Sequence, residues 1–324
     1  MTIGIPRALL YYYYFPLWRS LFTNLGHQVV VSAPTNGEML EEGIKQTVSE
    51  ICVPIKVYNS HVIELLKKDV DFIFVPRFVR NNGREWYCPK FLGLPELVKY
   101  SIPEAKEKMI SFDIHPKIDD TFDAKDFLPL CDYLNVSKRD LKNALKKANE
   151  DFLKFRAFME KGYDFERALS ALDGIDNPPP FKKGALNILL IGYVYNIYDP
   201  LVSMNIIQKL RDMNVNVYTF DMLNEKFIRN PKEKGKKIYW VFTRKIYNTV
   251  RRMLLDDEID GIIHLTAFVC GPDSVVGKLF ELDCDKYQKP FMTIRVDEHT
   301  GHGHLQTRIE AFVDMLKYKT KNAM

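Results

Sequence analysis

The stretch LTAFVCGPDS, residues 265–274, decides how the chain is interpreted, because an apolar strand ends in it and a helix begins. Cys270 stands at this break. Two other cysteines have a similar local setting: Cys52 lies in ICVP (51–54) and Cys88 in YCP (87–89), and each is followed within two residues by a proline and then by a helical pattern. We therefore predict that all three cysteines stand at the N-termini of helices.

This position gives a thiol a distinct chemistry. Unpaired backbone amides and the positive end of the helix dipole stabilise a thiolate there, and proline suits the first helical position because the amide that it lacks would have had no partner. The setting favours metal ligands or nucleophiles over the small apolar residue that a buried cysteine usually is. Cys131, in LPLC (128–131), and Cys284, in LDCD (282–285), lack the setting, and we expect both to be small apolar residues.

Strand patterns alternate with helical patterns in both halves of the chain. The apolar runs that predict strands fall in two series of four, at 3–6, 28–32, 70–76 and 109–114 and then at 189–192, 215–217, 259–263 and 290–294. Strands that alternate with helices need crossover connections and hence a mostly parallel sheet. The sequence predicts an α/β protein with two doubly wound parallel-sheet domains that form an internal repeat.

A purely helical segment separates the two series. We expect residues 1–114 to be an N-terminal α/β domain, 115–180 a helical connector and 181–324 a C-terminal α/β domain. Ser137 is the predicted N-cap of the connector helix. Apolar residues recur there at spacings of three and four and mark one buried face: Leu141, Leu145, Ala148, Phe152, Phe155 and Met159. The run NPPP (177–180) closes the segment.

The repeat gives Cys88 and Cys270 equivalent places, each after the third strand of its series and ahead of the next helix. Ligands of open α/β sheets bind outside the carboxyl ends of the strands, so both thiols are expected on the functional edges of their domains. If these edges face each other, one cleft would hold both thiols. Cys52 has no cysteine counterpart in the second series.

The spacing of these cysteines does not decide what they bind, since they form no close Cys-x-x-Cys pair of the ferredoxin or zinc-ribbon kind. An iron–sulfur cluster held by three cysteines, with its fourth iron position left to water, substrate or another group, fits a cleft between domains. Zinc held by three thiolates and one histidine fits the same count.

A second candidate site is the segment DEHTGHGH (297–304), which follows the last predicted strand. Glu298, His299, His302 and His304 could ligate a metal or do acid–base work. The alternative is a capping segment for a helix over 305–317. The same question applies to Asp273 and Ser274, because a carboxylate in a first helical turn is often only a cap.

Composition excludes several classes of protein. The net charge of +4 is spread over 46 basic and 42 acidic residues without a long block of one sign, so we expect no nucleic-acid partner. The sequence shows neither the pattern of a signal peptide nor an apolar run of the roughly 18 residues that a membrane helix needs. A cytoplasmic location is therefore expected. In that setting, five cysteines indicate free thiols or metal ligands and not a disulfide framework.

The chain resembles the acyl-CoA dehydratase activase-related family, relatives of the D-components of 2-hydroxyacyl-CoA dehydratases and benzoyl-CoA reductases. The similarity runs over nearly the whole chain. It is carried by GIPRA (4–8), CVP (52–54), CP (88–89), CGPDS (270–274), DEH (297–299) and TRIEAF (307–312).

The resemblance implies flavodoxin-like α/β domains around a cluster that is bound by cysteines and reduced by a separate ATP-hydrolysing activase at low potential. Carried over residue by residue, Cys52, Cys88 and Cys270 become the ligands. Some relatives hold a double-cubane cluster with six cysteines in one chain, whereas this chain has five, so a single four-iron four-sulfur cluster is expected. The chain has no Gly-rich phosphate loop of the Walker type. We therefore do not expect it to be the activase itself.

Three functions remain open at this point. The first is a cytoplasmic, oxygen-sensitive iron–sulfur protein that accepts electrons from the activase and reduces a small molecule or passes them to a partner subunit. The second is a noncatalytic subunit that binds a companion dehydratase-like chain and helps to scaffold its cluster. The expected partner is such a subunit or a second copy of the chain in a homodimer. The third is a zinc protein that uses the three cysteines with His299, His302 or His304.

Overall fold

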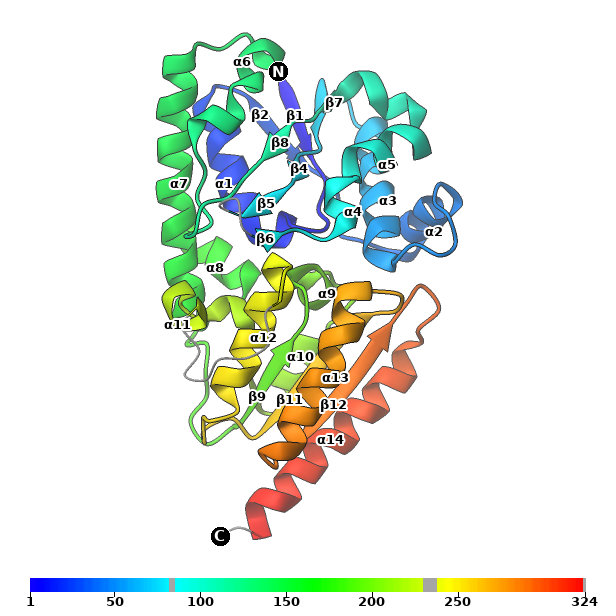
Figure 1. Cartoon of the computed structure of the whole chain (residues 1–324), viewed down its shortest axis with the longest axis vertical. Coiled ribbons are helices and arrows are strands. Elements are labelled where there is room, and N and C mark those ends of the chain that lie inside the picture. The colour runs from blue at the N-terminus through cyan, green and yellow to red at the C-terminus, as the bar shows by residue number, and fades with distance from the viewer. Residues whose placement is uncertain (82–84, 230–237, 323–324) are drawn as a thin grey trace. The chain divides into compact units, whose positions relative to one another are not determined.

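The computed structural model describes residues 1–81, 85–229 and 238–322 (Figure 1). The chain divides into two compact units. The first comprises Met1–Ala157 together with Tyr239–Val241, and the second comprises Phe158–Ile238 and Phe242–Met324. Each unit has its own parallel sheet with helices on it, so the expected α/β class with parallel sheets is confirmed.

The first unit is built on a four-stranded sheet with the order β2-β1-β3-β7. Its strands are β1 (Thr2–Ile5), β2 (Gln28–Val31), β3 (Phe72–Phe74) and β7 (Met109–Ile110). Every neighbouring pair is parallel. Crossover helices make this possible, since a parallel pair cannot be joined by a tight turn. The four predicted strands of the first series are therefore all present.

Seven helices of the first unit lie within the residues that the structure describes. They are α1 (Tyr11–Asn24), α2 (Gly37–Lys45), α3 (Val53–Lys67), α4 (Pro89–Leu92), α5 (Leu94–Ser101), α6 (Pro129–Leu134) and α7 (Lys138–Glu160), with short 3-10 turns at Pro103–Lys108 and Ala124–Phe127. α7 continues past Ala157 into the second unit.

The predicted strand 109–114 is interrupted. β7 ends at Ile110, and β8 (Asp113–Ile114) pairs instead with β4 (Arg77–Phe78). The backbone hydrogen bonds continue across this break, since the amides of Val75 and Arg77 donate to the carbonyls of Ile110 and Phe112 at 2.9 and 3.0 Å. The loop expected at 77–87 also contains β5 (Arg80–Asn81), which pairs antiparallel with β6 (Glu85–Trp86).

The long helix that the sequence predicts after Ser137 is present as α7. The Ser137 hydroxyl accepts the amide of Asp140 at 3.1 Å and caps α7. All six residues of the predicted apolar face are buried. One of them, Phe152, packs against Tyr13 and Tyr14 of α1 with ring centroids 6.0 and 5.5 Å apart.

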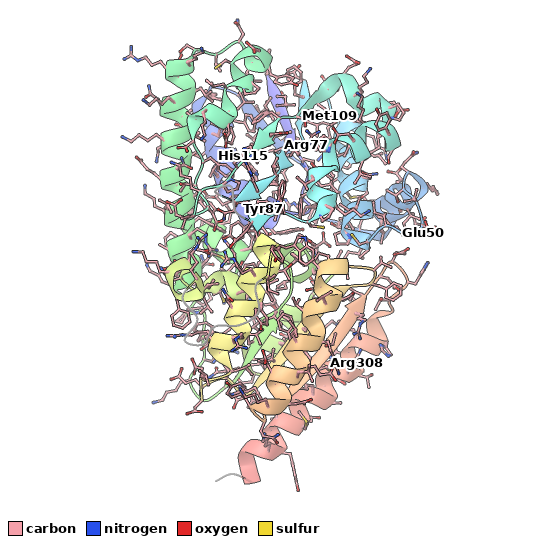
Figure 2. All side chains as sticks on the ribbon, viewed as in Figure 1. Glu50, Arg77, Tyr87, Met109, His115 and Arg308 are labelled. Atoms are coloured by element: carbon pink, nitrogen blue, oxygen red, sulfur yellow. The ribbon has the colours of Figure 1, made fainter. Side chains whose placement is uncertain are left out.

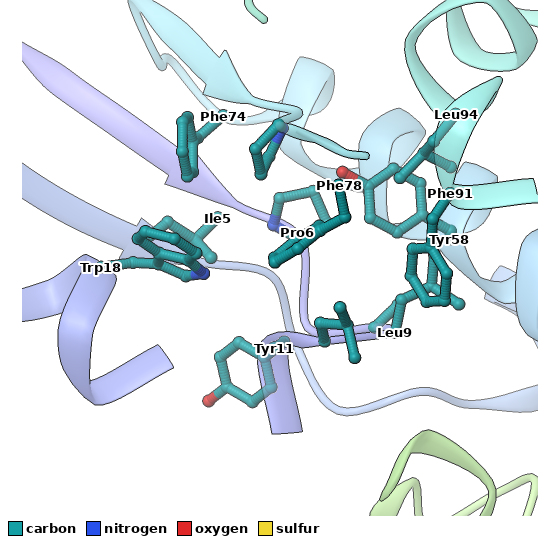
Figure 3. A pocket seen from close by; sticks show the side chains of 13 residues that line it. Ile5, Pro6, Leu9, Tyr11, Trp18, Tyr58, Phe74, Phe78, Phe91 and Leu94 are labelled. Carbon is teal, nitrogen blue, oxygen red and sulfur yellow. The ribbon is translucent and has the colours of Figure 1, made fainter. Parts of the chain in front are cut away.

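Aromatic side chains fill the core of the first unit. All four tyrosines at the start of α1 are buried, so this aromatic run packs against the sheet. Near the carboxyl ends of β1 and β3, Pro6, Leu9 and Phe78 line a small apolar cavity of about 30 Å³ (Figure 3). This volume is about that of one water molecule in the liquid. The cavity is too small for an organic substrate.

The second unit has a four-stranded parallel sheet of its own, with the order β10-β9-β11-β12. Its strands are β9 (Leu186–Ile191), β10 (Val215–Tyr218), β11 (Gly261–Ala267) and β12 (Phe291–Val296). All seven residues of β11 are buried, which is typical of a central strand covered on both faces.

Helices cover both faces of this second sheet. The helices of the unit are α8 (Phe165–Leu172), α9 (Val194–Tyr198), α10 (Ile206–Asp212), α11 (Glu225–Arg229), α12 (Val241–Met253), α13 (Gly271–Lys286) and α14 (His302–Asn322), with a 3-10 turn at Phe220–Met222.

Two of these helices lie on opposite faces of β11. Leu316 of α14 approaches Gly261, and Gly277 of α13 approaches His264. Residues an odd number apart on a strand point to opposite faces. Arg308, labelled on α14 in Figure 2, donates to the Thr293 carbonyl at 2.8 Å and fixes this helix to β12. Across the described parts of both units, no helix is long and apolar enough to cross a membrane.

Candidate functional site

The three cysteines singled out by the sequence each begin a helix. Cys52 is the N-cap residue of α3, Cys88 that of α4 and Cys270 that of α13, and each helix has a proline in its first two positions. The predicted local setting is therefore confirmed for all three. Cys52 and Cys88 belong to the first unit and Cys270 to the second.

Cys52 and Cys88 lie within electrostatic reach of each other. A charge on Cys88 raises the pKa of Cys52, and the ammonium group of Lys90 lowers the pKa of both thiols. Lys90 is exposed in the first turn of α4 and was not anticipated from the sequence, where it resembles any surface lysine. The two loops that precede α3 and α4 thus bring two thiols and one cation within electrostatic reach of one another.

Burial dominates the acidity of these thiols. It raises the pKa of Cys52 to about 11 and also raises the pKa of Cys88. The amide of Ile55 at the first thiol, and the amides of Lys90 and Phe91 at the second, act in the opposite direction but are weaker. The expectation that the helix N-termini would make these two residues thiolates is therefore wrong for the metal-free protein, because desolvation disfavours the charged form more.

Buried polar contacts hold the segment before Cys52 in place. Lys56, in the first turns of α3, is 2% exposed and donates from Nζ to the Ser49 carbonyl at 2.9 Å. α2 packs closely on α3 here, since a Cβ added at Gly43 would lie 2.2 Å from the Lys56 carbonyl oxygen. The position of Cys52 thus depends on the contact between these two helices.

A buried tyrosine cluster supports the segment before Cys88. The hydroxyls of Tyr14 and Tyr87 are 3.5 Å apart, and Tyr14 donates to Asp120 at 3.5 Å. Tyr13 donates to the same carboxylate at 2.8 Å. Tyr87, labelled in Figure 2, directly precedes Cys88. The aromatic core of the first unit therefore positions this residue.

Cys270 follows a strained turn in the second unit. Val269 has φ of 58°, a left-handed conformation that a β-branched residue rarely adopts. The carbonyl of Cys270 accepts the Ser274 amide at 3.0 Å and the Ser274 hydroxyl at 2.7 Å. Ser274 therefore closes the first turn of α13. These two hydrogen bonds give the Ser274 side chain a structural role in that turn.

Asp273 does not cap its helix. It is 1% exposed in the first turn of α13, and its Oδ2 lies 3.2 Å from Nε2 of His264 in β11. Sequence reasoning missed His264, although a single histidine inside the apolar strand GIIHLTA was a signal that could have identified it.

The histidine-rich segment before α14 is mostly exposed. The Asp297 carboxylate accepts the hydroxyl of Thr300 at 2.7 Å and the His299 amide at 2.9 Å, which is a local turn. These bonds lower the pKa of Asp297, with the Thr300 hydroxyl as the main cause.

Among the described side chains of this segment, the candidates lie apart from any group of three that could hold a metal ion. His299 Nε2 is 4.0 Å from Glu298 Oε1 and its ring is exposed, as is His304. The side chain of His302 lies outside what the structure describes.

None of the five cysteines forms a disulfide in the described chain. Cys284 is fully buried. Its pKa is raised to about 12, mainly by burial and secondly by the charge of Asp283. The thiol is therefore neutral, as expected of an apolar core residue. Cys131 is half-buried. Within residues 1–81, 85–229 and 238–322, no group of three or more His, Cys, Asp or Glu side chains is arranged to hold a metal ion.

Two family models match the chain. The model of the CoA enzyme activase uncharacterised domain matches residues 2–223, more than half of the sequence. The model of the 2-hydroxyglutaryl-CoA dehydratase D-component matches residues 164–316, which include Cys270. No curated protein matches the chain.

Proposed function

Because the chain belongs to the family of the CoA enzyme activase uncharacterised domain, we propose that it is an iron–sulfur protein of low-potential electron transfer. A single four-iron four-sulfur cluster is held by Cys52, Cys88 and Cys270. The role is that of an acyl-CoA dehydratase activase-related protein, either as an electron carrier or as the reductase component of a small-molecule enzyme.

The electrostatic coupling of the Cys52 and Cys88 thiols is the observation that carries this proposal. The two cysteines come from different loops and begin different helices. This arrangement favours a site for a shared ligand over two separate cysteines packed in the core. Backbone amides point at both sulfurs, and hydrogen bonds to cysteine sulfur tune iron–sulfur clusters. Lys90 supplies positive charge beside a group that would be anionic.

The raised pKa of Cys52 and Cys88 is compatible with metal binding. Iron binds thiolates, so loading must release the two protons that burial retains in the metal-free protein. A bound cluster would supply one-electron chemistry, with an iron position free for water or substrate. The chain's own contribution is to fix the sulfurs, donate amides to them and place Lys90 nearby.

Cys270 is the proposed third ligand because it repeats the setting of the other two, an N-cap followed by a proline. The same strand order in both four-stranded sheets supports the proposal that the chain is an internal repeat of flavodoxin-like domains. In this scheme 1–114 and 181–324 are the repeated domains, 115–180 connects them, and Cys88 and Cys270 are equivalent.

The proposed electron donor is a separate ATP-hydrolysing activase, as the names of both matching families support. A cytoplasmic location suits this role, because reduced thiols and an oxygen-sensitive cluster need a reducing compartment.

A second candidate function is a subunit of a larger enzyme. The match to a dehydratase D-component favours it, since a component by definition acts with other chains. Copurification from the native source discriminates between the two: a stable partner chain supports the subunit function, and turnover of a small molecule by the isolated chain argues against it.

The proposed function is tested by anaerobic reconstitution with iron and sulfide, followed by metal analysis and electron paramagnetic resonance. About four irons per chain and a reducible cluster signal are expected. Replacing Cys52, Cys88 or Cys270 by serine should abolish the cluster or convert it to a cluster of another type. Cys131→Ser and Cys284→Ala are the matched controls and should retain it.

Two outcomes would overturn the cluster. A colourless protein without iron after reconstitution removes it altogether. Stoichiometric zinc in protein purified without oxygen, with no iron uptake after zinc removal, identifies a zinc protein instead.

A further inference from the structure

The second sheet has a polar patch on a face that is otherwise buried. The register pairs His264 with Thr293 and Thr266 with Arg295, and residues two apart on a strand share a face. All four therefore point to the α13 side of β11 and β12. Sheets covered on both faces are normally apolar there, so four polar residues in one block require an explanation.

The helix above this patch is shaped to admit the His264 ring. A Cβ added at Gly277 would lie 3.3 Å from His264 Cε1, tighter than an ordinary contact. Phe280 meets the same ring edge-on with centroids 5.1 Å apart. The ring is thus held between β11 and the backbone of α13.

Buried polar atoms in this patch lack hydrogen bonds. His264 and Asp273 are each 1% exposed, and their contact of 3.2 Å does not have hydrogen-bond geometry. Among the residues that the structure describes, neither ring nitrogen of His264 and neither oxygen of Asp273 has a hydrogen-bond partner. Buried groups of this kind are rare in proteins, because leaving them unpaired costs the full desolvation penalty.

These groups line a cavity within the second unit. Its volume is about 240 Å³, room for roughly eight water molecules at about 30 Å³ each. Its lining includes His264, Thr266, Asp273, Thr293 and Arg295. Thr293 and Arg295 also line a larger depression along β12.

Arg295 is the one Lys or Arg residue in the lining of the cavity. Asp273 is the one acidic residue in the lining, and it already faces His264. In the described part of the chain, Arg295 has no ion-pair partner, and its side chain is exposed. A guanidinium group presents a planar fork of donors that matches a carboxylate, and the hydroxyls of Thr266 and Thr293 lie on the same face of the sheet.

We propose that this cavity binds a short-chain carboxylate, of roughly three to five carbon atoms by its volume. Arg295 holds the carboxylate, assisted by the hydroxyls of the two threonines. The aliphatic chain lies against Phe268 and Val269, which are 57% and 53% exposed and would be covered by it. The site belongs to the second unit alone and needs no cluster.

The experiment is calorimetric titration of the metal-free, full-length protein with propionate, its neutral isostere propionamide, and inorganic phosphate. Saturable binding of propionate with one site, at least tenfold tighter than propionamide and phosphate, is expected. Using metal-free protein separates this result from the fate of the proposed cluster.

Variants identify the residue responsible. Arg295→Gln should weaken propionate binding at least tenfold, and Arg295→Lys should retain part of it because the charge remains without the fork. Lys278→Gln removes a positive charge from the exposed side of α13 and should change nothing. Thermal unfolding of each variant checks that it is folded.

Three results overturn the proposal. Equal binding of propionate and propionamide shows that no carboxylate is recognised, and unchanged binding in Arg295→Gln places the ligand elsewhere. Tighter binding of phosphate than of propionate assigns the cavity to a different oxyanion.

Discussion

The thiols of Cys52 and Cys88 share one electrostatic environment, although each stands at the start of a different helix. The charge of one affects the pKa of the other, and the same cation, Lys90, acts on both. Burial nevertheless keeps both protonated in the metal-free protein. The two thiols are therefore electrostatically coupled and yet protonated, and these two properties can be separated by experiment.

The first prediction concerns the reactivity of Cys52. The thiolate is the reacting form, and burial raises the pKa to about 11. Alkylation of metal-free protein should be slow at neutral pH and accelerate as the pH approaches 11. Cys88→Ser removes a like charge, lowers the pKa of Cys52 and should accelerate its alkylation, as measured by site-resolved mass spectrometry. Cys131→Ser should not. Identical rates in Cys88→Ser and the unaltered chain would contradict the proximity of the two thiols.

The same shift makes stability depend on alkaline pH. The folded-state pKa of Cys52 is raised above its ordinary value of 9.0, so its contribution is complete below that value and is lost as the pH rises through about 11. A shift of this size corresponds to about 2–3 kcal/mol of unfolding free energy. Cys52→Ser should therefore flatten the loss of stability in this window, as urea unfolding at successive pH values would reveal.

Lys90 supplies the second prediction. Its ammonium group lowers the pKa of both thiols, so Lys90→Gln should raise both and slow their alkylation. Because the side chain is exposed, the effect should stay within about 1 kcal/mol, at most about fivefold in rate. High salt should reduce the difference. Lys99→Gln, on the neighbouring α5, is the matched control. A variant that alkylates faster than the unaltered chain would reverse the assigned sign.

The local setting of the cysteines was predictable from sequence, because a proline just inside a helix start is a short-range signal. Cys52, Cys88 and Cys270 are all N-cap residues as predicted. Their acidity was not predictable in the same way. Desolvation depends on the aromatic core that covers the site, and this core is assembled from residues far apart in the chain.

Other features escaped the sequence for related reasons. The interruption of the strand at 109–114 accompanies a change of partner from β3 to β4, which depends on pairing between segments far apart in the chain. Asp273 was considered as a cap because its position in a helix is local information. Its contact with His264 joins a helix to a strand and depends on how α13 packs on the sheet.

The third prediction concerns His61, which is buried in α3. Its ring nitrogens contact Ser32 at 2.8 Å and Thr35 at 2.9 Å. Burial lowers its pKa to about 3, and the charges of Arg7 and Lys68 add to the effect. A lowered histidine pKa contributes stability that is complete above the ordinary value near 6.5 and is lost as the pH falls toward 3.

Acid unfolding tests this contribution. Between pH 7 and pH 5 the unaltered chain should lose about 2 kcal/mol of unfolding free energy to protonation of His61 in the unfolded state. His61→Gln should be less stable at pH 7 but should show a shallower pH dependence. His299→Gln replaces an exposed histidine and should leave the slope unchanged. Equal slopes in His61→Gln and the unaltered chain would show that His61 does not carry this dependence.

The fourth prediction links helix packing to the thiol site. In Gly43→Ala the new methyl group would lie 2.2 Å from the carbonyl oxygen of Lys56, a backbone atom that cannot move without shifting α3. The cost should be about 1–3 kcal/mol by urea unfolding. Gly37→Ala is the control on the same helix, since its methyl group meets nothing within 4 Å. Its stability should be unchanged or higher, because alanine favours the helix.

The same variant should also expose Cys52. Lys56 donates to Ser49 and holds the segment before this cysteine, so a displaced α3 weakens that support. Alkylation of Cys52 should accelerate in Gly43→Ala but stay unchanged in Gly37→Ala, even where both proteins are fully folded. If Gly43→Ala is destabilised but Cys52 is alkylated at an unaltered rate, the packing of α2 does not control access to this thiol. Acceleration at Cys52 alone would show that the contact between α2 and α3 controls access to the thiol.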